Sequence, residues 1–173
     1  VVRSNSGASL VELDDGIGCI ELHAAKNAIG GDVLSLISTV LNPDSDAVRD
    51  FAGFVIAGDR DNFSVGANLM QLLMLAQEGE WHEVEGVIHR FQQMTAAIKF
   101  CPRPVVVAPF GLTLGGGAEI GLHAVRRQPY AETYIGLVEA GVGLIPAGGG
   151  TKEMLLRAID SAVALAPPDP RDP

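Results

Sequence analysis

Residues 104–119 read Pro-Val-Val-Val-Ala-Pro-Phe-Gly-Leu-Thr-Leu-Gly-Gly-Gly-Ala-Glu. The apolar, β-branched run at 104–108 predicts a short strand that is buried on both faces. Three consecutive glycines, Gly115 to Gly117, then lead into a helix that we expect to begin near Ala118. A buried strand that runs through a glycine-rich turn into a helix is typical of an α/β fold.

The same alternation continues in both directions from this stretch. Residues 54–57 form another continuous apolar run, residues 133–135 a third short strand, and residues 8–12 and 17–23 a β-hairpin around Asp14-Asp15-Gly16. The spacing of apolar residues predicts helices over 32–41, with Asp32 as the N-cap, and over 67–77, 81–100, 118–125 and 151–165. The pattern predicts an α/β fold with parallel strands, a core over residues 1–165, and a Pro-rich tail or linker over 166–173.

Composition excludes several classes of protein. The 173 residues are 47% apolar and carry a net charge of −9 without a basic cluster, which argues against binding to nucleic acid or to an anionic membrane. No stretch approaches the roughly 18 apolar residues of a membrane span, and the N-terminus lacks a signal-peptide core. We therefore expect a cytoplasmic protein, with Cys19 and Cys101 as buried free thiols. Because the sequence does not begin with Met, we expect it to be part of a larger protein.

The glycine-rich loops do not match the common nucleotide or nucleophile motifs. None of them has the Gly-x-Gly-x-x-Gly spacing of a dinucleotide site, so no NAD site is expected in this chain. Ser64 fails the nucleophile-elbow pattern because Asn62 stands where the first glycine belongs. The four histidines lack a metal-ligand spacing, so we interpret them as surface residues and expect no metal.

The glycines at 115–117 have two interpretations. They could allow close packing between a helix and a strand, or they could let a ligand approach the backbone closely. Unpaired N–H groups at the following helix start would suit a developing oxyanion. Glu119 lies just inside the helix that follows this turn, and Glu139 lies in the next loop. Both could be catalytic. Alternatively, Glu119 is a favourable acid in a first helical turn and Glu139 is an exposed loop carboxylate.

At this point the sequence resembles the crotonase superfamily. The resemblance rests on four segments in the family's order and spacing, which cover nearly the whole chain. They are Lys26-Asn27-Ala28-Ile29, similar to the Asn-Ala-Leu segment beside CoA; Phe63-Ser64-Val65-Gly66-Ala67-Asn68-Leu69, similar to Phe-x-x-Gly-Ala-Asp-Leu; Pro104 to Ala108 with Gly111, Gly115-Gly116-Gly117-Ala118-Glu119; and the glycine-rich stretch from Gly136 through Glu139 to Gly149.

The resemblance implies the core portion of a crotonase (ClpP-like) ββα superhelix and a set of site residues. It implies that the N–H groups of Ala67 and Gly116 form an oxyanion hole, and that Glu119 and Glu139 are the two catalytic glutamates. It places the acyl-CoA substrate near a wider set of residues: Lys26, Ala28, Val65, Gly66, Ala67, Asn68, Leu69, Gly115, Gly116 and Val138. Asn68 departs from the family's usual Asp; it serves equally well if that residue only caps a helix.

The implied activity is hydration of 2-enoyl-CoA to 3-hydroxyacyl-CoA in fatty-acid β-oxidation, with Glu119 as base toward water and Glu139 as acid. The alternatives are an enoyl-CoA isomerase, which needs one carboxylate, and a non-catalytic acyl-CoA-binding module. Residues 131–139 look most like the crotonase part of bacterial 3-hydroxyacyl-CoA dehydrogenases. The resemblance therefore implies a covalently linked dehydrogenase domain, with NAD only in that larger protein, and a homo-oligomer that is trimer-like in the family.

Overall fold

The computed structural model describes residues 1–165, so the tail expected at 166–173 lies outside the described residues. Its main element is a six-stranded mixed sheet in the order β1-β2-β3-β4-β5-β7. The strands are β1 (Arg3–Ser4), β2 (Ala8–Glu12), β3 (Ile17–Leu22), β4 (Gly53–Gly58), β5 (Val105–Val107) and β7 (Arg126–Arg127). The expected hairpin is β2–β3, and β3, β4, β5 and β7 are mutually parallel, as the α/β prediction requires.

Two further strands form a small parallel sheet beside the large one. β6 (Leu112–Leu114) pairs with β8 (Tyr134–Gly136), with Leu114 opposite Gly136. β6 and β7 were not anticipated, because strands of two or three residues carry too little periodicity to stand out from a loop. The small sheet matters for the site because it aligns the turn at Gly115 with the loop that follows Gly136.

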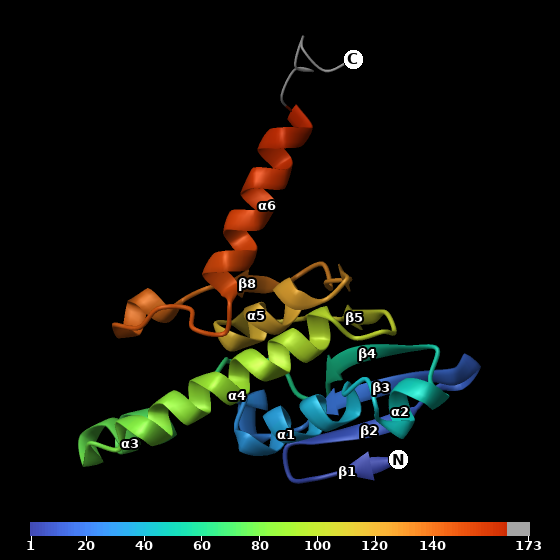
Figure 1. The fold of residues 1–173 in the computed structure, drawn as a ribbon, viewed down its shortest axis with the longest axis horizontal. Coiled ribbons are helices and arrows are strands. Elements are labelled where there is room, and N and C mark those ends of the chain that lie inside the picture. The colour runs from blue at the N-terminus through green and yellow to red at the C-terminus, as the bar shows by residue number, and fades with distance from the viewer. Residues whose placement is uncertain (166–173) are drawn as a thin grey trace.

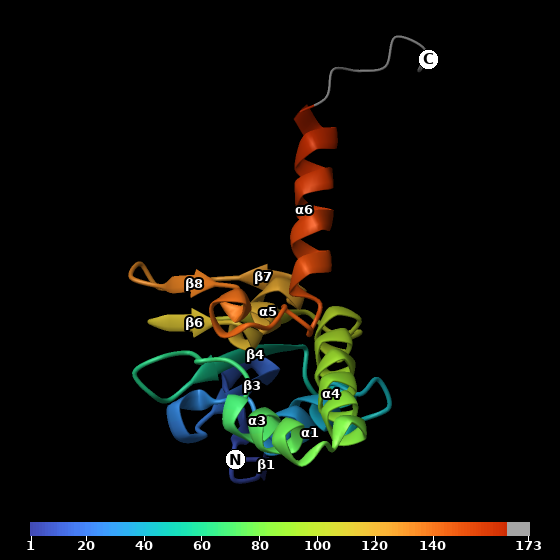
Figure 2. The ribbon, with the colours of Figure 1, turned by 90° about the vertical axis from the view of Figure 1, so that its left-hand side faces the viewer.

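Six α-helices and three short 3₁₀ turns occur in residues 1–165. The helices are α1 (Gly31–Val40), α2 (Asp46–Asp50), α3 (Leu69–Glu78), α4 (Trp81–Lys99), α5 (Gly116–His123) and α6 (Gly150–Leu165). The 3₁₀ turns are η1 (Asp14–Gly16), η2 (Ala25–Asn27) and η3 (Glu139–Val142). α1 and α4 lie together on one face of the large sheet (Figure 1), whereas α5 lies beside β6 and β8 (Figure 2).

The core lies between that sheet face and the helices α1 and α4. Ile20 of β3, Ile56 of β4 and Val107 of β5 are fully buried there with Ile37 of α1 and Met94 of α4. Burial of each such side chain contributes about 1.5–3 kcal/mol relative to exposure. The apolar run at residues 54–57 therefore lies in β4, as expected of a strand, although only one of its faces is fully buried, since Val55 and Ala57 are half-buried.

Several helix boundaries differ from the expectation. α1 begins at Gly31 with Gly30 as the N-cap, so Asp32 lies inside the first turn, where its carboxylate accepts a hydrogen bond from Ser6. α5 begins at Gly116, two residues earlier than expected, because Gly115 has a left-handed φ of 51° and acts as the cap. The prediction that all four histidines lie on the surface is wrong for His123, which is only 4% exposed.

α6 points away from the rest of the molecule (Figure 1; Figure 2). Only its first turns contact the body, and apolar side chains along it are exposed: Met154, Leu155, Leu156 and Ile159. Across residues 1–165, every helix is too short or too polar to span a bilayer. Cys19 and Cys101 are free and half-buried, rather than buried as expected.

Candidate active site

The loop before α3 runs alongside β6 and reaches the start of α5. The N–H of Ser64 donates to the Leu112 carbonyl at 3.1 Å, and the N–H of Leu114 donates to the Ser64 carbonyl at 2.9 Å. Gly66, with φ +94°, lies so close to this strand that a Cβ there would be 2.9 Å from the Leu114 carbonyl oxygen and 3.4 Å from the Gly116 nitrogen. The main chain at Gly66 and Ala67 therefore lies beside the first residue of α5.

Two amides at this junction are left open by the fold. Within residues 1–165, neither the N–H of Ala67 nor that of Gly116 donates a hydrogen bond to another backbone group. Gly116 is the first residue of α5, whose first N–H groups have no carbonyl one turn earlier to bind and lie at the positive end of the helix dipole. The structure thus places the two expected oxyanion-hole residues next to each other.

A buried serine fixes the shape of the loop. The hydroxyl of Ser64 donates to the Asn27 carbonyl at 2.7 Å and accepts from the N–H of Gly66 at 3.1 Å. Ser64 has no exposed surface, which agrees with its failure as a nucleophile motif. The hydrogen bonds of this one side chain therefore hold η2 and the Gly66 turn together.

The residues expected near CoA lie along the same edge. The N–H of Ile29 donates to the Gly66 carbonyl at 2.8 Å, and the N–H of Asn68 donates to the Ile29 carbonyl at 3.3 Å. Together with the bridge between Ile29 and Ala67, these bonds join the segment after η2 to the Gly66 turn, and Lys26 is exposed with a left-handed φ of 55°. Residues 26–29 and 63–69 are thereby brought together in space.

Glu119 is almost fully enclosed on α5. Its side chain is 2% exposed, and its Oε1 accepts a hydrogen bond from the N–H of Gly150 at 2.8 Å. Burial raises the pKa of Glu119, and the nearby charge of Glu139 raises it further, while the Gly150 N–H opposes the rise. A carboxylate with a raised pKa and a fixed orientation is suited to proton transfer near neutral pH.

Glu139 reaches the same place from η3. A Cβ built on Gly115 would lie 2.9 Å from Glu139 Oε1, so the carboxylate rests against the glycine turn. Its Oε2 is buried without a hydrogen-bond partner among the described residues. The pairing of β6 with β8 explains this approach, because Leu114 and Gly136 are in register and Gly115 N–H donates to the Gly136 carbonyl at 2.9 Å.

One residue of this arrangement, Phe91, was not identified as part of the site from the sequence. Phe91 of α4 lies under both glycine turns, since a Cβ at Gly116 would meet its Cζ at 2.6 Å and one at Gly148 would meet its Cε1 at 2.5 Å. At Gly117 a Cβ would lie 2.8 Å from the Cβ of Ser64. Close packing is therefore part of the reason for the glycines at both 116 and 117.

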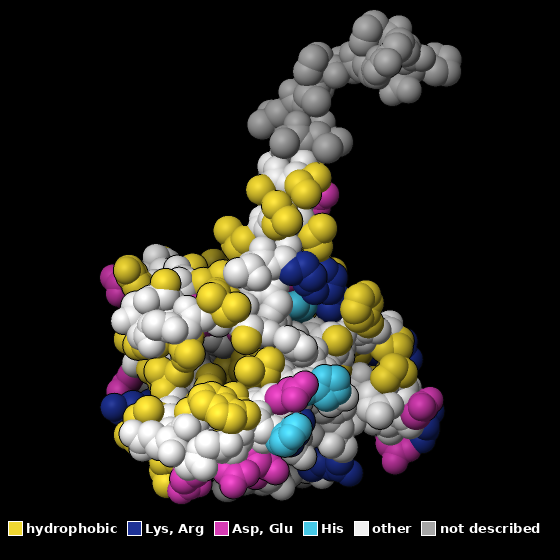
Figure 3. All heavy atoms as spheres, turned by 60° about the vertical axis from the view of Figure 1, so that its left-hand side comes forward, with side chains coloured by type: hydrophobic (Ala, Val, Ile, Leu, Met, Phe, Trp, Pro, Cys, Tyr) yellow, Lys and Arg dark blue, Asp and Glu magenta, His cyan; other side chains and the backbone are white. Residues whose placement is uncertain are grey.

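Apolar side chains are exposed on α3 and on the segment just before η3. Figure 3 shows hydrophobic side chains around a depression on the face where α3 and the η3 loop come forward. Leu69 and Met70 on α3 and Val138 before η3 are among the exposed apolar side chains of these two segments. Leu69 and Val138, which the sequence predicted for the substrate, are thus both exposed apolar residues.

Asn68 acts as a helix cap. Its Oδ1 accepts from the N–H of Gln71 at 3.3 Å at the start of α3. This is the role in which Asn and Asp are equivalent. The departure from the family's usual Asp is therefore compatible with the fold of the loop.

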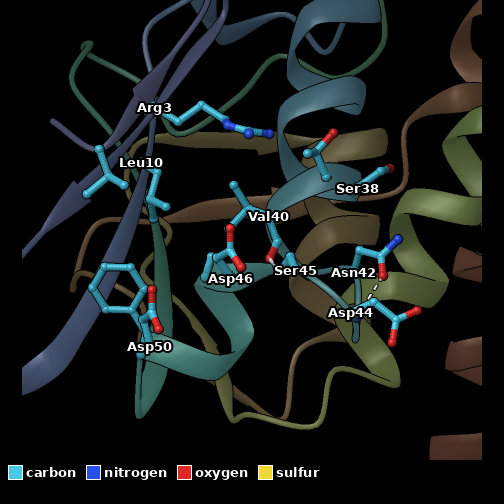
Figure 4. Close-up of a pocket in the computed structure, with 13 residues that line it drawn as sticks. Arg3, Leu10, Ser38, Val40, Asn42, Asp44, Ser45, Asp46 and Asp50 are labelled. Carbon is cyan, nitrogen blue, oxygen red and sulfur yellow. Dashed lines mark hydrogen bonds between the residues drawn. The ribbon is translucent and has the colours of Figure 1, made fainter.

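A cavity lies elsewhere in the molecule. It has a volume of about 660 Å³ and is formed by β1, β2, the end of α1 and α2 (Figure 4). Asp44, Asp46 and Asp50 line it together with Arg3, and none of the expected site residues does. Residues 1–165 contain no cluster of three or more His, Cys, Asp or Glu side chains that could hold a metal ion.

Comparison with known proteins places this geometry in context. A family model described as enoyl-CoA hydratase/isomerase matches residues 17–164. A Bacillus subtilis protein named "Probable 3-hydroxyacyl-CoA dehydrogenase" is 48% identical over 156 residues, which are 90% of this chain and 19% of that protein. A Rickettsia felis protein assigned as a trifunctional enzyme of the fatty acid oxidation complex is 30% identical over 91% of this chain and 21% of its own length. The chain thus spans about a fifth of the length of these relatives.

Solved structures share the fold at low identity. An enoyl-CoA hydratase from Bacillus anthracis has a TM-score of 0.75 at 21% identity, over 86% of this chain and 57% of that one. An enoyl-CoA hydratase from Polaromonas sp. JS666 has a TM-score of 0.77 at 21% identity, over 85% of this chain and 57% of that one. These likenesses establish the architecture.

Proposed function

The chain belongs to the enoyl-CoA hydratase/isomerase family and has the crotonase fold, and from this we propose that it hydrates 2-enoyl-CoA thioesters to 3-hydroxyacyl-CoA. The observation that carries the proposal is that the carboxylates of Glu119 and Glu139 lie near each other, so that the charge of Glu139 raises the pKa of Glu119. Glu139 rests against the turn at Gly115, and Glu119 rests against the turn at 148–150. Hydration needs one group to take a proton from water and another to deliver a proton to carbon. An isomerase needs only one.

In the proposed reaction the thioester carbonyl accepts hydrogen bonds from the N–H groups of Ala67 and Gly116. These donors stabilise the negative charge that develops on the oxygen as water adds to Cβ. The water oxygen forms the new bond to Cβ, the Cα–Cβ π electrons move toward the thioester, and Cα receives a proton. The product is the 3-hydroxyacyl thioester with no change in redox state.

We assign Glu119 as the base toward water and Glu139 as the acid toward Cα. The raised pKa of Glu119, caused first by burial, supports a group that holds a proton after taking it from water. The Oε2 of Glu139 has no partner among residues 1–165, which leaves it available to a bound water or substrate. Both carboxylates also contact the water in this scheme, so their roles are coupled.

The relatives support a proposal for the wider setting of the reaction. Both curated relatives are much longer than this chain, and one is named as a 3-hydroxyacyl-CoA dehydrogenase. We propose that the chain works covalently linked to such a dehydrogenase in fatty-acid β-oxidation, because the product of hydration is the substrate of that oxidation. NAD would then bind the dehydrogenase part. The exposed apolar side chains of α6 support the further prediction of a homo-oligomer.

The test is a steady-state assay of crotonyl-CoA and longer enoyl-CoA substrates, followed by loss of the conjugated-thioester absorbance, on protein that contains this chain. Hydration with loss of that absorbance supports the proposal. Interconversion of 3-enoyl-CoA and 2-enoyl-CoA without hydration would instead identify an isomerase. Binding of acyl-CoA with no turnover would identify a binding module.

A further inference from the structure

The hydrogen bond to the Glu119 carboxylate comes from α6, a helix of which only the first turns contact the rest of the molecule. The Gly150 N–H that holds Glu119 Oε1 is the first amide of α6, and α6 projects outward beyond its first turns (Figure 2). Anything that shifts the start of α6 therefore shifts the donor on Glu119.

Part of the anchorage comes from α4 just before the helix. The side chain of Gln92 donates to the Ala147 carbonyl at 2.8 Å, and the hydroxyl of Thr95 donates to the Gly148 carbonyl at 2.9 Å. These bonds hold the loop that leads into α6. They do not reach the helix itself.

The first turn of α6 is held by a buried acid. Glu153 is 3% exposed, and its Oε1 lies 2.6 Å from the Nζ of Lys99 on α4 and 3.6 Å from Nε2 of His123 on α5. Lys152, on α6 itself, lies 3.0 Å from the same oxygen. Although burial alone would raise it, hydrogen bonds from Lys99 and Lys152 lower the pKa of Glu153 to about 2, so the group is ionised at neutral pH.

His123 packs between this acid and the helix of Glu119. Its Nδ1 lies 2.8 Å from the backbone carbonyl oxygen of Glu119 and donates to it, since a carbonyl only accepts. A Cβ at Gly149 would lie 2.9 Å from His123 Nε2, so the imidazole fills the space beneath the glycine that precedes Gly150. The ring thus touches α5, the turn and Glu153 together.

We propose that Glu153 is a positioning residue that, through its ion pair with Lys99, fixes the first turn of α6 against α4 and so fixes the Gly150 amide on Glu119. Lys99 is the decisive partner because it lies on α4 and ties two helices together. Lys152 contacts the same oxygen from within α6 and cannot do so. The effect on turnover rests on the function proposed above, whereas the effect on the Glu119 carboxyl group does not.

The test compares Lys99→Gln with Lys152→Gln. Both remove one positive charge beside the same carboxylate, so a purely electrostatic effect would be similar in the two. The readout is a carbon-13 NMR titration of side-chain carboxyl groups, with the Glu119 resonance assigned by its loss in Glu119→Gln. Amide spectra of the rest of the chain report whether each variant is folded.

We expect Lys99→Gln to raise the pKa of Glu119, because the carboxylate loses the Gly150 donor, and Lys152→Gln to leave it unchanged. Lys99→Arg keeps the pair and should restore the original titration. In an active protein, Lys99→Gln should lower kcat by up to about 10²-fold with little change in KM, as expected for a misplaced catalytic group. Equal shifts in the two Gln variants, or no shift in a folded Lys99→Gln, overturn the proposal.

A charge-conserving variant decides the matter if Lys99→Gln does not fold. Glu153→Asp keeps the negative charge but shortens the reach toward Lys99, and we expect a smaller upward shift of the Glu119 pKa. An unchanged titration in that variant would also overturn the proposal. The expected titrations in a protein without hydratase turnover would leave the positioning role standing and remove the proposed reaction instead.

Discussion

The two glycine turns at 115–117 and 148–150 look alike in sequence but differ in what their amides do. Each leads into a helix N-terminus, α5 in the first case and α6 in the second. At the first turn the Gly116 N–H has no backbone partner within residues 1–165, whereas at the second the Gly150 N–H is taken by Glu119. The same local arrangement therefore leaves its amide without a backbone partner in one place and binds the protein's own carboxylate in the other, and only the surroundings distinguish them.

The largest expected effect comes from removing the carboxylates that lie between the two turns. Glu119→Gln and Glu139→Gln should each lower kcat for hydration by about 10²–10⁴-fold, because each removes one proton-transfer group. Binding of a saturated acyl-CoA should change little. Steady-state kinetics and calorimetric titration on the same preparations measure the two quantities, and near-normal turnover in either variant would remove that residue from the mechanism.

Phe91 offers a way to disturb both turns at once. Its ring fills the space beneath Gly116 and Gly148, so Phe91→Ala should lower the free energy of unfolding by about 3–5 kcal/mol. Chemical denaturation measures this loss. Met94→Ala is the control, since it empties the same core from the same helix without touching either turn; only Phe91→Ala should also alter the titration of Glu119.

Acid should lower the free energy of unfolding through Glu153, whose ion pairs hold the helix that follows the second turn. Glu153 has its pKa lowered from an ordinary 4.5 to about 2, so its ionisation stabilises the fold above pH 4.5, and this contribution is lost as pH falls toward 2. The contribution is on the order of 3 kcal/mol. Denaturation curves at several pH values should show this fall in unfolding free energy in the unmodified chain and a flatter profile in Glu153→Gln; parallel profiles would contradict the assignment.

The smallest effect concerns the cap of α3, beside the first turn. Asn68→Ala should cost about 1 kcal/mol of stability, because the Gln71 N–H loses its acceptor, while Asn68→Asp should be nearly neutral. Thermal melts of the two variants provide the comparison. A substantial change of hydratase rate in Asn68→Asp, without a change in melting, would show that the residue has more than a capping role.

The sequence was sufficient for those parts of the fold that depend on local pattern. Buried strands are visible as apolar runs at 54–57 and 104–108, and the helices follow from their spacing, with boundary errors where a glycine rather than an acid caps the helix. Glu119 and Glu139 were predicted as site residues from a family motif. The groups that surround them could not be predicted, because the amide that binds Glu119 belongs to a helix that begins 31 residues later.

The buried cluster around Glu153 illustrates the same limit. Lys99, His123 and Glu153 each look like surface residues when read alone, and their burial follows only from the packing of three helices. Phe91 is a similar case, since its helical spacing predicts burial but not contact with two glycine turns. Tertiary contacts between distant segments, rather than residue types, decide these roles.

The open amides of Ala67 and Gly116 have a consequence for how such a protein is studied. Alanine scanning removes side chains, yet Ala67 is already alanine and neither group in question is a side chain at all. Replacement of the amide by an ester at either position, through chemical ligation, would delete the N–H and leave every side chain in place. The positions of these two N–H groups depend on main-chain torsion angles. Substitution of side chains alone therefore leaves the groups in place and does not test them.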